Sequence, residues 1–126
     1  MQHVPIKLHV LDFNWVRTSP DFVRPSMGHE LADADPDRYA DWHLELGCNA
    51  LFQHAYTFNG CAWYPTRLGP RVPEPGTSFL PRVLERAHAE GLPFHSYFCV
   101  GQDRFIAANR PDWVIPESEG FGAGVL

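Results

Sequence analysis

Polar and aromatic side chains gather where predicted strands end. The candidate binding residues among them are Asp12, Asn14, Gln53, His54, Asn59, Trp63 and Tyr64. Indole and phenol rings offer flat apolar faces, whereas carboxylate, amide and imidazole groups make directional hydrogen bonds. A sugar ring has apolar C–H faces and hydroxyl groups around its edge, so it needs both kinds of contact. The mixture therefore predicts a carbohydrate substrate.

Each of these residues also has a structural interpretation. Asp12 can cap a turn after the first strand, and His54 can be a satisfied structural histidine. Trp63 and Tyr64 can close the end of the fold as packing residues. Asp103, after the third strand, is expected to cap a short helix. Both interpretations stay open at this point.

Several classes of function have no support in the sequence. The net charge of −5 and the pI near 5.7 argue against a nucleic-acid or anionic-membrane partner. No H-x-H or H-x-x-x-H pair, G-x-G-x-x-G, P-loop or G-x-S-x-G motif occurs. We therefore expect no metal site and no cofactor. Three cysteines without a C-x-x-C pair, and no visible secretory signal, favour free thiols in the cytoplasm.

The predicted elements alternate between strands and helices. Strands are expected at residues 6–13, 48–56 and 93–100. One helix should begin at Asp35-Pro36 and end at Gly47, and a second should be capped by Thr77 or Ser78 and end at Gly91. A short helix should cover residues 103–109, and long loops should cover 16–34 and 57–76.

This order predicts an α/β fold with a parallel sheet. Long loops after the strands and short turns before them favour the (β/α)₈ TIM barrel, whose chemistry lies on the loops that follow the strands. A complete barrel needs about 250 residues, so 126 residues provide about the first three of its eight units. The tail over 114–126 has no defined pattern. We interpret residues 1–126 as the incomplete N-terminal part of such a barrel.

Seven short motifs resemble a known family. They are residues 58–66 (FNGCAWYPT), 68–70 (LGP), 80–83 (LPRV), His88, Gly91, 97–101 (YFCVG) and 110–112 (RPD). Over residues 8–113 the chain resembles the N-terminal part of α-L-fucosidase-like glycoside hydrolases. That resemblance implies a TIM-barrel catalytic domain acting on fucosides or related sugars. Relatives carry a His-His pair at the end of the second strand, and here the pair reads Gln53-His54.

The resemblance implies that the catalytic residues lie outside this chain. The nucleophile of such enzymes follows the fourth strand, and the acid/base carboxylate follows later, so both are expected beyond Leu126. The leading hypothesis is a fragment of a retaining glycoside hydrolase of carbohydrate metabolism. The alternative is a non-catalytic sugar-binding remnant that self-associates through exposed sheet edges. A third possibility is a small α/β domain whose aromatic residues all belong to the core.

Overall fold

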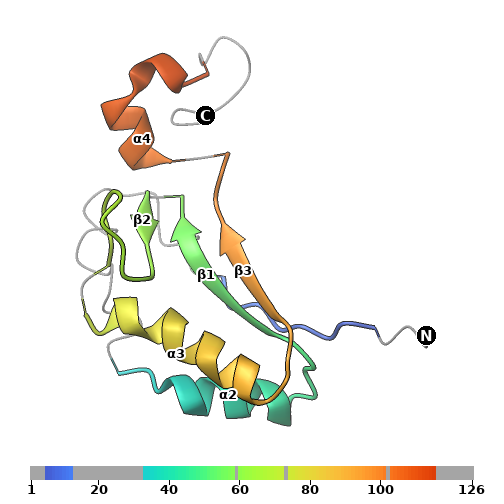
Figure 1. The fold of residues 1–126 in the computed structure, drawn as a ribbon. Coiled ribbons are helices and arrows are strands. Elements are labelled where there is room, and N and C mark those ends of the chain that lie inside the picture. Colours follow the sequence, from blue (N-terminus) through green and yellow to red (C-terminus); the bar gives the residue numbers. More distant parts are fainter. Residues whose placement is uncertain (1–4, 13–32, 59, 73, 102, 116–126) are drawn as a thin grey trace.

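The computed structural model describes residues 5–12, 33–58, 60–72, 74–101 and 103–115. It shows a small α/β fold with a three-stranded mixed sheet in the order β2-β1-β3 (Figure 1). The helices α2 and α3 lie against each other along the sheet, and the short helix α4 lies beyond the carboxyl end of β3. The elements are α2 (Pro36–Glu45), β1 (Leu51–Thr57), β2 (Cys61–Ala62), α3 (Gly76–Ala89), β3 (Phe94–Phe98), α4 (Arg104–Asn109) and the 3₁₀ turn η1 (Pro111–Trp113).

The start of α2 follows from its capping residues. The side chain of Asp35 accepts hydrogen bonds from the backbone N–H groups of Asp37 at 2.9 Å and Arg38 at 3.5 Å. Pro36 occupies the first turn, where its missing N–H costs no hydrogen bond. Gly47, with φ of 79°, follows the helix in a left-handed conformation that suits glycine. The predicted boundaries of this helix are confirmed.

The start of α3 differs from the prediction. The helix begins at Gly76, and Pro75 is its N-cap residue without a side-chain hydrogen bond. Capping by Thr77 or Ser78 is therefore wrong, since both lie inside the first turn. The hydroxyl of Ser78 instead donates to Glu74 at 2.6 Å. The predicted glycine ending is confirmed, because Gly91 follows the helix with φ of 67°.

The sheet is mixed and not wholly parallel. β1 and β3 are parallel and are connected through α3, as the alternating pattern predicted. β2 lies within the segment predicted as a loop over 57–76 and pairs antiparallel with the end of β1, where Tyr56 faces Ala62. A two-residue strand is too short to show alternation in a sequence, so the loop prediction is wrong at this point.

The first predicted strand is also wrong over the part that the structure describes. Residues 5–12 form no strand. They are attached to the turn before β1 through Asn49, whose N–H donates to Lys7 O at 3.1 Å and whose side chain accepts from Lys7 N at 2.7 Å. The Asn49 amide nitrogen also donates to Pro5 O at 3.0 Å. An asparagine side chain thus replaces the strand-to-strand ladder.

The two faces of β1 have different surroundings. Leu51 belongs to the hydrophobic core, together with Phe79, Val83 and Ala87 of α3. Side chains alternate along a strand, so the even-numbered residues of β1 face away from the helices. On that face the ring of His54 contacts Phe52, Tyr97 and Asp12, and these contacts define the candidate site.

Candidate functional site

A histidine and a carboxylate meet on the face of the sheet opposite the helices. The Nε2 atom of His54 lies 3.3 Å from Oδ1 of Asp12. The His54 side chain is 2% exposed and the Asp12 side chain is 40% exposed. The rings of Phe52 and Tyr97 lie beside the imidazole, with centroid separations of 5.2 and 4.8 Å. The structure therefore joins two residues that are far apart in the sequence.

The surroundings of His54 favour its neutral form. Burial lowers the pKa of His54, and the Asp12 carboxylate opposes this effect without reversing it. A carboxylate is only an acceptor when ionised, so Nε2 of the neutral ring must carry the proton that faces Asp12. The contact is then a hydrogen bond from imidazole to carboxylate at neutral pH. His54 orients Asp12, and the partly exposed Asp12 can accept a hydrogen bond from a ligand.

Gln53 lies on the other face of β1. Its side chain is completely buried, and its Oε1 accepts a hydrogen bond from the backbone N–H of His54 at 2.9 Å. Its Nε2 has no hydrogen-bond partner among the residues that the structure describes. Adjacent residues of a strand point to opposite faces, so Gln53 and His54 do not form a joint contact surface. The two-residue periodicity of a strand is the sequence signal that predicts this separation of Gln53 from His54.

The aromatic candidates occupy different environments. Trp63 is 3% exposed and belongs to the hydrophobic core, where its indole N–H donates to Thr57 Oγ1 at 3.3 Å. Its ring is therefore not presented to solvent. Tyr64, the next residue, is partly buried. Asn14 and Asn59 lie outside the described residues.

A second polar contact lies at the carboxyl ends of β1 and β3. The hydroxyl of Tyr56 donates to Oδ2 of Asp103 at 2.6 Å, and Oδ1 of Asp103 accepts from the backbone N–H of Ile106 at 2.7 Å. Asp103 is 3% exposed and is the N-cap of α4, as predicted. Burial, followed by the neighbouring Asp103 carboxylate, raises the pKa of Tyr56. Both oxygens of Asp103 are thus used by the fold itself. No local sequence pattern points to Tyr56 as the partner of Asp103, because the two residues are 47 positions apart.

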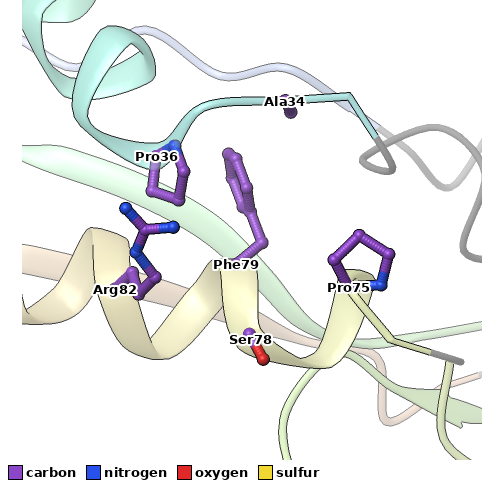
Figure 2. Close-up of a pocket in the computed structure, with 6 residues that line it drawn as sticks. All are labelled: Ala34, Pro36, Pro75, Ser78, Phe79 and Arg82. Atoms are coloured by element: carbon purple, nitrogen blue, oxygen red, sulfur yellow. The ribbon is translucent and has the colours of Figure 1, made fainter.

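A small hollow lies between the starts of α2 and α3 (Figure 2). It is lined by Ala34, Pro36, Pro75, Ser78, Phe79 and Arg82. The only charged lining group is the Arg82 guanidinium, which lies 3.6 Å from the carboxylate of Asp37. None of the candidate binding residues that the structure describes lines this hollow.

The described residues also bear on metal binding, membrane spanning and thiol chemistry. In the described ranges, no cluster of three or more His, Cys, Asp or Glu residues is arranged to hold a metal ion. No helix in these ranges has both the length and the apolar character needed to cross a membrane. Cys48 and Cys61 are free thiols. Burial raises the pKa of Cys61 to about 11, which keeps this thiol protonated at neutral pH.

The chain was compared with protein-family models, curated proteins and solved structures, and it has no match in any of the three.

Proposed function

We propose that this chain is the N-terminal part of a glycoside hydrolase barrel, retaining and α-L-fucosidase-like, and that it contributes a sugar-binding contact. Two things support the proposal: the resemblance of the sequence motifs and the Asp12–His54 contact. The second carries more weight, because it concerns the face of the sheet opposite the helices, which would point inward in a TIM barrel. Branched aliphatic residues usually fill a barrel interior. Here that face carries the imidazole of His54 with a carboxylate beside it.

In this proposal Asp12 is the group that contacts the sugar. Its carboxylate is partly exposed and has room to accept a hydrogen bond from a sugar hydroxyl. His54 is a positioning residue, because its ring is buried and its Nε2 faces Asp12. Tyr97 packs against that ring and limits its movement. Trp63 has no part in the contact, because the core covers its indole ring.

Hydrolysis needs more than these residues. Glycoside cleavage uses two carboxyl groups, placed about 5–5.5 Å apart in retaining enzymes. Asp103 is a poor second carboxylate, because it is buried and accepts hydrogen bonds from both Tyr56 and Ile106. We therefore propose that the nucleophile and the acid/base residue follow Leu126. A cytoplasmic location is a separate part of the same proposal. In this proposal the described residues contribute part of a sugar-binding site.

Sugar titration of the chain tests the contact. We expect L-fucose to shift the ¹H–¹⁵N resonances of His54 and Tyr97, and Asp12→Asn to weaken binding. A hydrogen bond to a charged group contributes about 1.5–3 kcal/mol, which corresponds to roughly a 10- to 150-fold loss of affinity. D-Glucose at the same concentration measures the preference for fucose.

His95→Gln is the matched control. His95 is exposed and pairs with Phe52 in the β1–β3 ladder, so it lies beside the candidate site on a neighbouring strand. Binding should be unchanged in this variant. No resonance shift with either sugar would contradict the proposal, and so would equal weakening by Asp12→Asn and His95→Gln.

A further inference from the structure

The sheet has one open edge among the described residues. The outer side of β2 is covered, because Ala62 N–H donates to Pro70 O at 3.0 Å and Val72 N–H donates to Ala62 O at 2.9 Å. β3 lies at the other end of the sheet (Figure 1) and pairs with β1 alone in the described part of the chain. Its residues are exposed or only partly buried. The edge of β3 is therefore accessible to another strand.

The hydrogen bonds to β1 show which backbone groups of β3 remain available. Pro93 O accepts from Leu51 N–H at 3.0 Å, and Cys99 N–H donates to Tyr56 O at 3.0 Å. Backbone groups of alternate residues in a strand point to the same side. Residues 95 and 97 then also point toward β1, whereas Phe94, Ser96 and Phe98 point their N–H and C=O groups outward.

The residues of β3 contain none of the features that usually protect an edge strand. Natural edges carry charged residues, proline or bulges that block pairing. The strand reads Phe-His-Ser-Tyr-Phe, without Lys, Arg, Asp, Glu or Pro. Phe98 is 53% exposed. The register irregularity in the β1–β3 ladder lies on the β1 side, between His54 and Tyr56, and leaves the outer edge of β3 unaffected.

The order of residues in β3 is self-complementary when the strand is reversed. If two copies run antiparallel with Ser96 opposite Ser96, then Phe94 lies opposite Phe98 and His95 lies opposite Tyr97. Each flanking position then pairs one ring with another, and aromatic pairs are favourable cross-strand neighbours. No charged side chain of β3 would enter the contact, which suits a chain with a net charge of −5.

We propose that two copies of this chain associate through their β3 edges, antiparallel and about a twofold axis at Ser96. Because the same edge is used by both copies, the contact is closed and the assembly stops at a dimer. The outward N–H and C=O groups of Phe94, Ser96 and Phe98 make the new hydrogen bonds. The sheet then continues across the axis in the order β2-β1-β3-β3-β1-β2. The barrel of the proposed function would place a fourth strand on this same edge, so the dimer is the assembly of residues 1–126 without that strand. Its formation does not depend on sugar binding.

Light scattering measures the mass of the whole chain in solution and tests the proposal. The chain concentration should run from about 1 μM to about 1 mM, because this range covers weak to moderate affinities. We expect a shift from monomer to dimer. Amide hydrogen exchange adds a test of register: protection at Phe94, Ser96 and Phe98 should rise with chain concentration. Protection at His95 and Tyr97 should not depend on concentration.

Two substitutions at Ser96 and one elsewhere complete the experiment. Ser96→Pro removes an outward N–H, which an edge strand tolerates, and Ser96→Lys adds a charge. Both should abolish the dimer. Ala89→Lys makes the same charge change at an exposed position near the end of α3 and should leave the dimer intact. Circular dichroism shows whether Ser96→Pro folds. If it does not, the comparison of wild type with Ser96→Lys tests the dimer.

Three results would overturn the proposal. The first is a monomer at every concentration. The second is an equal degree of association in wild type and Ser96→Lys. The third is a mass that grows beyond the dimer, which would exclude a closed twofold contact.

Discussion

The Nε2 atom of His54, in the middle of β1, lies 3.3 Å from Oδ1 of Asp12, in the segment that precedes the first described helix. This relationship attaches the N-terminal segment to the sheet at one end, while Asn49 attaches it to the turn before β1 at the other. It also connects a buried imidazole with a partly exposed carboxylate. The same pair joins two segments of the fold and is the contact that we propose for a sugar.

The stability of the fold should fall in acid because two buried histidines are held neutral. Burial lowers the pKa values of His43 and His54 below their ordinary value of 6.5. The unfolded chain then binds protons more readily than the folded chain, so stability is complete above pH 6.5 and is lost as the pH falls through the folded pKa values. Each histidine contributes a slope of up to about 1.4 kcal/mol per pH unit. Urea unfolding from pH 8 to pH 5, a range chosen to bracket the histidine titration, measures this slope.

Single substitutions assign the slope to individual histidines. His43→Gln and His54→Gln should each make the dependence shallower. His88→Gln should leave it unchanged, because His88 is exposed on α3. An unfolding free energy that stays constant between pH 7 and pH 5 in the wild-type chain would contradict buried neutral histidines.

Gly60 should tolerate no side chain. Its φ is 80°, and an added Cβ would lie 2.5 Å from both Asp103 Oδ1 and Phe105 Cβ. Gly60→Ala combines left-handed strain with overpacking and should cost about 2–4 kcal/mol. Gly47 is the matched control, because its φ of 79° is similar but nothing lies within 4 Å of an added Cβ. Gly47→Ala should cost only about 1–2 kcal/mol. Thermal unfolding of both variants measures the difference, and equal losses would show that the close approach to Asp103 has no energetic effect.

The hydrogen bond from Tyr56 to Asp103 should stabilise the carboxyl end of the sheet. Tyr56→Phe removes the donor at 2.6 Å and leaves a buried carboxylate oxygen without it. The expected loss is about 1–3 kcal/mol in the free energy of unfolding. A double-mutant cycle with Asp103→Ala isolates the pair, because Asp103→Ala also removes the N-cap of α4. Additive losses in the cycle would show that the two side chains do not interact energetically.

Local signals predicted the helices of this protein well. Asp35 and Pro36 at the start of α2, Gly91 after α3 and Asp103 before α4 each act within a few residues of themselves. Their effects do not depend on the rest of the fold. The cap of α3 is the exception, since Ser78 lies inside the first turn and donates to Glu74, which precedes the helix.

The long-range contacts could not be predicted in this way. β2 has only two residues, and its antiparallel pairing with Tyr56 and Thr57 depends on where the following loop returns. The segment over 5–12 has a strand-like composition but meets the side chain of Asn49 instead of a neighbouring strand. Strand composition reports how a residue fits a sheet, and it carries no information about which partner is within reach.

The amino-acid sequence by itself determined the alternation of α2, β1, α3 and β3, most of the helix ends and the composition of the candidate site. These features depend on backbone conformation and side-chain chemistry over a few residues. Only the tertiary structure decided which candidates share a surface. It placed Trp63 in the core, put Gln53 and His54 on opposite faces, and joined His54 to Asp12. The physical reason is that these contacts join segments far apart in the chain. Packing of the whole sheet against α2 and α3 brings such segments together, and no local sequence pattern encodes that packing.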